Sequence, residues 1–301
     1  MCGIVGYWEK TGEETCILGR TLLRMAEALG CRGPDSSGVA LFGPEQPGRL
    51  VVRVKLGEGS GSSEQAAVMS RAIASYGGCD IRQEEAYLRF TIDESADLDS
   101  FVQAVESAAP AVEVVSLGRR LEIIKQVGSP ANLDRTFQIS RFRGTHGIGH
   151  TRLSTESAVD LSHSQPFWGH GYPDLAIVHN GHITNYHQLR RKFEQRGVRF
   201  YTGNDSEIVA IFLAGKLRQG MDLRGGLLAM IEELDGSFSC LVATATEFGF
   251  VKDPFSLKPL VFAETEQFVA VATEEIAIRS AIEGNFEVRE AQAKEVRVWR
   301  R

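Results

Sequence analysis

The sequence opens with Met1-Cys2-Gly3-Ile4-Val5-Gly6-Tyr7-Trp8, which predicts a short apolar strand beginning at the second residue. Chain ends normally fray, so a strand at this place is unusual. Methionine before a small residue is normally removed, which leaves Cys2 with a free α-amino group. Such a residue carries a thiol nucleophile and its own general base, an amine with a reference pKa of about 7.7–8.0. The simpler interpretation is that Cys2 is a small buried residue in a strand.

The composition is that of a soluble globular protein. Of the 301 residues, 43% are apolar and 24% are charged, and the net charge of -6 leaves no basic excess for binding nucleic acid. No apolar run is long enough to span a membrane, and the N-terminus lacks the features of a secretory signal. The five cysteines are scattered without CxxC spacing, which excludes a disulfide framework. We therefore expect a reduced, cytoplasmic protein that binds neither nucleic acid nor membranes.

The pattern of predicted elements divides the chain into two parts. Residues 2–42 and 146–301 carry the N-terminal strand, helices predicted over 15–29, 186–195 and 205–217, and short successive strands that favour an antiparallel sheet. Residues 43–145 start with Gly- and Pro-rich linkers and continue in a strand–helix–strand order. They therefore predict a small inserted α/β subdomain. Gly57-x-Gly59-x-Gly61 lacks the Lys and Ser/Thr of a phosphate loop and predicts a flexible connector.

Two motifs at predicted strand ends carry groups suited to an amino-acid substrate. Gly149-His150-Thr151-Arg152-Leu153-Ser154-Thr155 joins an arginine to hydroxyl side chains, which suits a bidentate grip on a carboxylate. His179-Asn180-Gly181 offers a side-chain amide and a backbone N–H to a tetrahedral oxyanion. Taken singly, an exposed arginine and an ordinary Asn-Gly turn explain them as well.

A third motif, Gly203-Asn204-Asp205-Ser206-Glu207, predicts a helix start with acidic residues in its first turn. Plain N-capping explains this pattern, and the functional alternative is that Asp205 binds a substrate α-ammonium. The seven histidines lie between His146 and His187, but no HExxH motif or carboxylate-rich set accompanies them. We therefore predict no metal site.

Together these segments closely resemble the class II glutamine amidotransferases, a family of N-terminal-nucleophile hydrolases. The resemblance implies an α+β fold, the four-layer αββα sandwich of these hydrolases, with residues 2–42 and 146–301 as the glutaminase domain and 43–145 as the insertion. It covers essentially the whole chain outside that insertion. The matching motifs are Cys2–Gly6, Arg32–Gly38, Gly149–Arg152, His179–Gly181 and Asp205–Glu207, followed by Lys252-Asp253-Pro254 and Ala272-Thr273-Glu274.

The resemblance also implies the chemistry. Cys2 would attack L-glutamine and form a thioester, with its own amine as the base, to give L-glutamate and ammonia. Asn180 and the Gly181 N–H would form the oxyanion hole. The implied substrate-binding residues are Arg152 for the carboxylate and Asp205 for the amine, with Arg32, Thr155 and His179 around the pocket.

The acceptor of the ammonia is expected on another protein. Known family members fuse the glutaminase to an acceptor domain, whereas this sequence contains no Walker loop or dinucleotide fingerprint. The insertion and the run Gly144–Arg152 are similar to stand-alone amidotransferase subunits of glutamate-synthase-like systems, notably the N-methylglutamate synthase small subunit. The resemblance implies a hetero-oligomer, no cofactor in this chain, and a partner that carries FMN and an iron–sulfur cluster.

Two positions depart from the sugar-amidating members of the family, and two other interpretations stay open. Leu153 replaces an aromatic residue of those members, and Glu156 stands where they often have His. A non-catalytic regulatory or scaffold subunit would keep the same fold, and another N-terminal-nucleophile amidase would act on a different amide. The pair Arg152 and Asp205 favours glutamine, because it offers one charge to each end of an amino acid.

Overall fold

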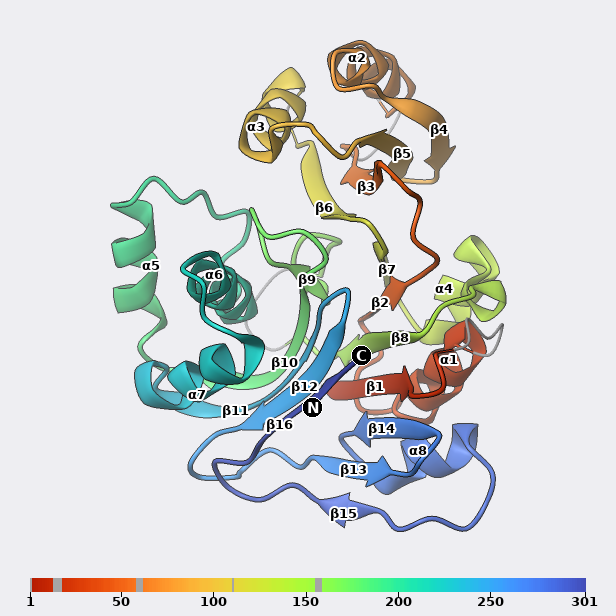
Figure 1. The fold of residues 1–301 in the computed structure, drawn as a ribbon, viewed down its shortest axis with the longest axis vertical. Coiled ribbons are helices and arrows are strands. Elements are labelled where there is room, and N and C mark those ends of the chain that lie inside the picture. The colour runs from red at the N-terminus through yellow and green to blue at the C-terminus, as the bar shows by residue number, and fades with distance from the viewer. Residues whose placement is uncertain (1, 13–17, 58–61, 110, 155–158) are drawn as a thin grey trace.

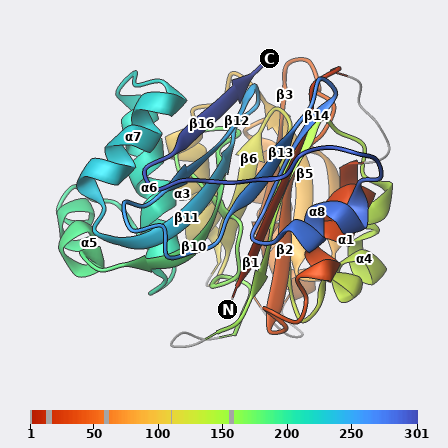
Figure 2. The ribbon, with the colours of Figure 1, turned by 90° about the horizontal axis from the view of Figure 1, so that it is seen from below.

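The structure is a computed structural model that describes residues 2–12, 18–57, 62–109, 111–154 and 159–301. In these ranges the strands form two large stacked sheets and one smaller sheet (Figure 1). Helices cover the outer face of each large sheet, so helix, sheet, sheet and helix follow one another as four layers (Figure 2). This arrangement confirms the predicted α+β sandwich.

The first large sheet contains the N-terminal strand, β1 (Gly3–Glu9), away from its edges. β1 pairs with β14 on one side and β8 on the other, and this double pairing holds the first residues of the chain in place. The seven strands lie in the order β15 (Arg289–Glu290), β13 (Val261–Glu264), β14 (Phe268–Ala272), β1, β8 (His146–Arg152), β2 (Ser36–Phe42) and β7 (Leu121–Val127).

The second large sheet is also antiparallel, as the short successive strands predicted. Its order is β16 (Val296–Arg300), β12 (Glu247–Lys252), β11 (Gly236–Ala243), β10 (Ala176–Ile183) and β9 (Phe167–Trp168).

Alternation of side chains along the strands gives each large sheet an inner and an outer apolar face. On β1, Ile4 and Trp8 belong to the core between the sheets, whereas Val5 and Tyr7 belong to the core under the helices. The seven-stranded sheet is covered by α1 (Leu18–Ala28), α4 (Pro130–Phe137), the short helix η1 (Ile139–Arg141) and α8 (Glu275–Ala281). The five-stranded sheet is covered by α5 (Tyr186–Glu194), α6 (Asp205–Arg218) and α7 (Leu223–Glu233).

The smaller sheet, which we call the inserted sheet, lies at one end of the molecule, at the top of Figure 1. Its chain order, βαββαβ, with the strands arranged β4-β5-β3-β6, is that of a split βαβ unit. One face packs Val52 and Phe90 against its helices, and the alternation places Arg53 and Arg89 on the opposite face. Its elements are β3 (Arg49–Lys55), α2 (Ser62–Ala74), β4 (Cys79–Glu84), β5 (Tyr87–Asp93), α3 (Leu98–Ala108) and β6 (Glu113–Gly118).

The inserted sheet is smaller than the predicted insertion, residues 43–145. Within that range, β7 pairs with β2 in the seven-stranded sheet, and α4 contacts α1 and β2. The end of the predicted insertion is therefore structurally part of the four-layer sandwich. None of the helices in the described ranges combines the length and apolar character that crossing a bilayer requires.

Candidate active site

A cavity of about 460 Å³ opens where the two large sheets bring their strand ends together. β1 is antiparallel to β8, so the start of β1 and the end of β8 share one edge of the sheet. The end of β10 and the N-terminus of α6 complete the wall. The lining residues are Cys2, Arg152, Leu153, Gln165, His179, Asn180, Gly181, His182, Ile183, Thr184, Tyr186, His187, Gly203, Asn204, Asp205, Ser206 and Lys258.

The structure brings six of the predicted site residues to this cavity: Cys2, Arg152, His179, Asn180, Gly181 and Asp205. They come from four segments that are far apart in the sequence. The predicted substrate-binding residue Thr155 lies outside the described residues, as do Glu156 and Met1.

Cys2 is half-buried and held mainly by its backbone carbonyl. That oxygen accepts hydrogen bonds from Asn180 Nδ2 at 3.2 Å and from Arg32 Nε at 3.4 Å. The Sγ atom lies 3.7 Å from the carbonyl oxygen of Leu153. Cys2 is thus fixed between β8 and β10, with its sulfur at the cavity.

Arg32 lies behind Cys2 and does not belong to the cavity lining among the described residues. Its guanidinium binds the Cys2 carbonyl and forms an ion pair with Glu274. Arg32 therefore supports Cys2 from outside the cavity lining, and its predicted part in substrate binding stays a prediction. Glu274 belongs to the late Ala-Thr-Glu motif, and this ion pair gives that motif a physical role.

Arg152 ends β8 at the cavity and is only 4% exposed. Its Nη2 lies 3.4 Å from the Ser154 hydroxyl, and the Ser154 N–H donates to Asp35 at 2.7 Å. Burial lowers the pKa of the Arg152 guanidinium, while the neighbouring Cys2, Asp160 and Asp35 act in the opposite direction. Arg152 is therefore a cation in a largely desolvated wall, where a ligand carboxylate would be held strongly.

His179-Asn180-Gly181 forms the cavity end of β10. The His179 side chain is buried, its Nδ1 is 2.8 Å from Ser206 Oγ, and burial lowers its pKa. Gly181 has a φ of +149°, and an added Cβ would lie 2.0 Å from the carbonyl oxygen of Ser237. Only glycine fits there, because β11 lies directly against the backbone.

Asp205 is the first residue of α6, where the helix dipole favours a negative charge. Its Oδ2 accepts the Ile183 N–H at 2.9 Å, and its Oδ1 lies 3.9 Å from His179 Nδ1. The side chain is 20% exposed, so it keeps hydrogen-bonding capacity toward the cavity. Glu207 is different, because both of its oxygens are satisfied within the chain by the segment Tyr201–Thr202.

Sequence reasoning missed several lining residues, above all Gln165 and Lys258. Gln165 precedes a proline at a strand start, and Lys258 follows the Lys-Asp-Pro motif, so each had a signal nearby. Neither signal identifies a cavity on its own, because the partners are backbone groups distant in sequence. Asp253 of that motif accepts N–H bonds from Phe238 and Phe255, which fixes the turn before Lys258.

No group of three or more histidine, cysteine or acidic side chains that could hold a metal ion occurs among the described residues. His146 and His150 are buried in β8, and burial lowers the pKa of each to about 3. His146 is hydrogen-bonded to the Thr244 carbonyl at 2.7 Å and to the Thr145 hydroxyl at 2.9 Å. These two histidines are neutral residues of the core.

Comparison with known proteins agrees with this geometry. Residues 150–280 match the family described as a glutamine amidotransferase domain. A Methanothermobacter thermautotrophicus protein named as a glutamine amidotransferase is 33% identical over 306 residues, covering 99% of both chains. The glutamine amidotransferase-like protein GlxB of Rhizobium meliloti is 35% identical over 278 residues, covering 91% of this chain and 89% of GlxB.

Solved structures support the fold. The glutamine phosphoribosylpyrophosphate amidotransferase from B. subtilis superimposes with a TM-score of 0.62 at 19% identity, covering 99% of this chain and 49% of that one. From the relatives matched over nearly their whole length, we conclude that the chain belongs to the class II glutamine amidotransferases, enzymes that act on the amide bond of glutamine.

Proposed function

We propose that this amidotransferase hydrolyses L-glutamine to L-glutamate and ammonia with Cys2 as the nucleophile, once Met1 has been removed. We also propose that the ammonia passes to a separate acceptor protein. One observation carries the first part of the proposal. Cys2, Arg152, Asn180 and Asp205 line a single cavity, although they come from four separate segments.

The reaction uses the two groups of the exposed N-terminal cysteine. The α-amine takes the thiol proton, and Sγ attacks the side-chain amide carbon of glutamine. The C–N bond then breaks, and ammonia leaves with the proton that the α-ammonium returns. Water, deprotonated by the same amine, attacks the thioester carbon. The C–S bond then breaks, glutamate is released, and the ammonium returns its proton to Sγ.

Asn180 is the proposed donor to the oxyanion that forms in each attack. An amide nitrogen carries two hydrogens, and one of them binds the Cys2 carbonyl at 3.2 Å. The second is the proposed donor to the amide oxygen of glutamine, which would develop negative charge in the cavity that Asn180 and Cys2 both line. The Gly181 N–H is the proposed second donor.

The two ends of the amino acid find opposite charges across the cavity. The planar Arg152 guanidinium suits the α-carboxylate, and the partly exposed Asp205 suits the α-ammonium. His179 would act indirectly, because its buried ring supports β10 and the start of α6.

Three measurements on the purified chain test the nucleophile. Intact mass should show that Met1 is absent. A glutamine-mimicking electrophile should label Cys2, and Cys2→Ala should abolish both labelling and hydrolysis. Cys31→Ala is the matched control, because Cys31 is another free cysteine that is more exposed than Cys2 but does not line the cavity. Labelling at Cys31 instead of Cys2 would refute the proposal, whereas a folded chain that binds glutamine without hydrolysing it would favour the scaffold alternative.

The proposed acceptor is a glutamate-synthase-like chain that carries FMN and an iron–sulfur cluster, as in the N-methylglutamate synthase system that the sequence resembles. Exposed apolar side chains at the cavity support a protein partner at this place. Leu153 lines the cavity and is 36% exposed, and Phe255 and Leu257, which precede the lining residue Lys258, are 67% and 71% exposed. A partner that covers this rim would keep ammonia from bulk water.

Leu257→Asp tests that partner, because it adds a charge to the rim without altering a cavity-lining side chain. Glutamine hydrolysis by the isolated chain should stay unchanged, whereas glutamine-dependent amination by the reconstituted pair should fall. Amination driven by added ammonium is the internal control and should not change. Equal rates of glutamine-dependent amination with the wild-type and Leu257→Asp proteins would exclude this rim as the docking site.

A further inference from the structure

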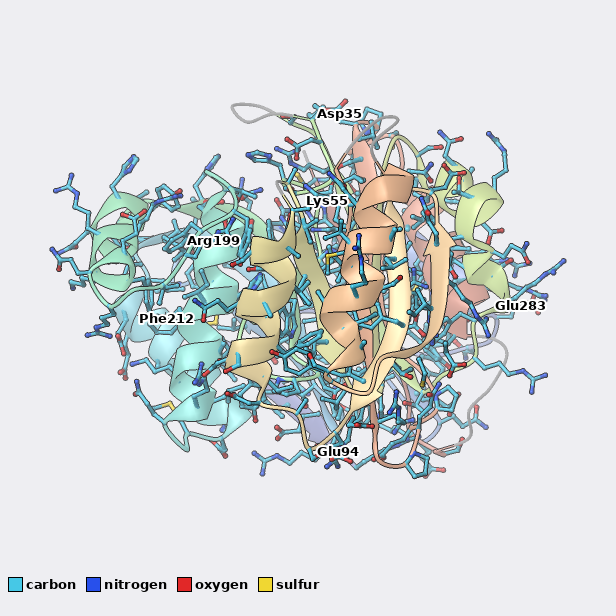
Figure 3. The ribbon with its side chains drawn as sticks, turned by 90° about the horizontal axis from the view of Figure 1, so that it is seen from above. Asp35, Lys55, Glu94, Arg199, Phe212 and Glu283 are labelled. Atoms are coloured by element: carbon cyan, nitrogen blue, oxygen red, sulfur yellow. The ribbon has the colours of Figure 1, made fainter. Side chains whose placement is uncertain are left out.

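A short segment of residues 160–166, which we call the bridging loop, lies between the inserted sheet and the cavity. Its Ser164 and Gln165 are buried, and Leu161 packs against the core between the large sheets. Figure 3 labels Lys55, a residue of the inserted sheet, and shows it toward the edge of the molecule that carries Asp35, while Glu94 lies at the opposite edge. The loop makes hydrogen bonds both to the cavity wall and to the inserted sheet.

Toward the cavity, Gln165 substitutes for a missing backbone neighbour of β10. The pairing of β9 with β10 places Phe167 opposite Ile177. Continuing this register places Gln165 opposite His179. Pro166, which lies between Gln165 and Phe167 in the sequence, has no N–H to donate to β10. The Gln165 side chain accepts the His179 N–H at 2.7 Å and donates to the His179 carbonyl at 2.9 Å. It thereby fixes the residue that immediately precedes Asn180.

The same loop also holds the start of α6. Gln165 Nε2 donates to Ser206 Oγ at 3.1 Å, and Asn204 Nδ2 donates to the His163 carbonyl at 3.2 Å. Ser206 and Asn204 flank Asp205 on both sides. The bridging loop therefore contacts both segments from which the cavity takes its oxyanion donor and its carboxylate.

Toward the inserted sheet, Ser162 contacts the oppositely charged side chains of Lys55 and Glu113. Its hydroxyl donates to Glu113 at 2.7 Å and is in contact with the ammonium of Lys55. Lys55 and Glu113 are register partners on β3 and β6, and their own charges are 3.5 Å apart. Their side chains are 17% and 8% exposed, so the contacts between Ser162, Lys55 and Glu113 are largely shielded from water.

The charge on Glu113 is maintained despite its burial. Burial by itself raises the pKa of this carboxyl, but Lys125, Lys55 and the Ser162 hydroxyl outweigh it and hold the pKa below its ordinary value. Lys125 belongs to β7, and its ammonium lies 5.1 Å from the centre of the Phe167 ring. The Glu113 anion is thus shared between the inserted sheet, β7 and the loop.

We propose that the inserted sheet sets the geometry of the glutaminase cavity through this chain of contacts, with Glu113 and Ser162 as positioning residues and Gln165 as the link to Asn180 and Asp205. The inference rests on the proposed glutaminase function. A misplacement of about 1 Å in an active site can cost about 100-fold in rate, so a partial loosening of the loop is enough to be measured.

Glutamine hydrolysis by point variants tests the proposal. Ser162→Ala and Glu113→Gln should each lower kcat/KM by about tenfold, mainly in kcat, because they displace the oxyanion donor without removing a substrate contact. Ser162→Thr keeps the hydroxyl and should retain wild-type activity. Cys2 should still react with iodoacetamide at the wild-type rate, whereas the glutamine-mimicking electrophile should react about tenfold more slowly.

Glu122→Gln is the matched control. Glu122 is a second buried carboxylate facing the inserted sheet, but its partners are Arg53 and Arg89, which lie outside the bridging loop. It should lose stability and keep kcat/KM. Equal activity losses in Glu113→Gln and Glu122→Gln would overturn the proposal, since a general loosening would then explain both.

A double variant locates the pathway. If Glu113 acts through Gln165, adding Glu113→Gln to Gln165→Met should cause little further loss of kcat/KM, whereas independent effects would multiply and refute the pathway. Ser162→Ala serves in the same cycle if Glu113→Gln does not fold. A wild-type chain that fails to hydrolyse glutamine would defeat the proposed function, whereas active variants that match an active wild type would defeat only this inference.

Discussion

The cavity and the polar face of the inserted sheet both bury charged side chains, but they use them differently. At the cavity, Asp205 has one oxygen on a backbone N–H, and its other oxygen lies 3.9 Å from the imidazole of His179, whose pKa is lowered by burial. Against the polar face of the inserted sheet, Glu122 of β7 accepts three bonds from Arg53 and Arg89 at 2.8–2.9 Å. Arg53 also binds Glu84 at 2.8 Å.

This contrast shows that buried charge alone does not identify a functional site. A groove of about 410 Å³ runs over the Arg53–Glu122 cluster, yet its buried charges satisfy one another. Burial raises the pKa of Glu122, but Arg53 and Arg89 outweigh it and hold that pKa below its ordinary value. Charges with hydrogen-bonding capacity directed into a cavity distinguish the proposed active site. Variants of the two regions should therefore separate activity from stability.

The largest separation is expected for Cys2→Ala. Removing the nucleophile should lower kcat for glutamine hydrolysis by at least about 1,000-fold, because only binding and oxyanion stabilisation would remain. Thermal unfolding should be nearly unchanged, since Cys2 is half-buried and its fixed contacts are made mainly by its backbone. A cysteine variant that keeps more than a tenth of the activity would remove Cys2 from the mechanism.

Glu122→Gln should give the opposite result. It removes the carboxylate partner of Arg89 and leaves Arg53 with Glu84 alone, so the free energy of unfolding should fall by about 3 kcal/mol. Urea denaturation measures this loss, and kcat/KM for glutamine should stay within about twofold of wild type. A large activity loss at a temperature where the variant is still folded would show that the Arg53–Glu122 cluster affects the cavity and is not independent of it.

Asp205→Asn sharpens the comparison from the cavity side. Asparagine keeps an oxygen for the Ile183 N–H, so stability should change little, but it loses the charge proposed for the α-ammonium. A charge-assisted hydrogen bond contributes about 1.5–3 kcal/mol, which corresponds to about a 10- to 100-fold rise in KM. Steady-state kinetics would show it, and a fall in kcat at constant KM would assign Asp205 to another step.

The smallest effect is the pH dependence of stability, which should also differ between the regions. His146 and His150 have pKa values of about 3 in the fold, and unfolding restores about 6.5, so the unfolded chain binds protons that the folded chain does not. Stability should therefore decrease as pH falls below about 6.5, by about 0.7 kcal/mol per histidine between pH 7 and pH 6. The contributions of Glu113 and Glu122, whose pKa values are lowered, should be lost only below about pH 4.5.

Urea unfolding at pH 7 and pH 6 measures the histidine contribution directly. His150→Gln should reduce the difference between the two pH values by about 0.7 kcal/mol. An unchanged difference in that variant would mean that His150 already titrates normally in the folded protein.

The sequence predicted the four-layer sandwich and the cavity residues of β1, β8 and β10, because these are contiguous motifs at strand ends. It did not predict that β7 joins the main sheet, since alternation along Leu121–Val127 shows a strand but not its neighbour. α7 was also missed, because Gly225 and Gly226 weaken its helical pattern. Gln165 was missed for a related reason, as its two bonds to His179 are made with main-chain atoms that any sequence would supply.

The place where the inserted sheet joins the sandwich has an evolutionary consequence. Phe42 at the end of β2 pairs with Leu121 at the start of β7, and the Gly43 N–H donates to the Arg120 carbonyl at 2.9 Å. The inserted segment thus leaves the sandwich at the end of β2 and returns to it at the start of β7, at the tip of the hairpin that these two strands form. A tight turn would close the same hairpin, so a lineage can gain, exchange or shed this module and leave the sandwich beneath it whole.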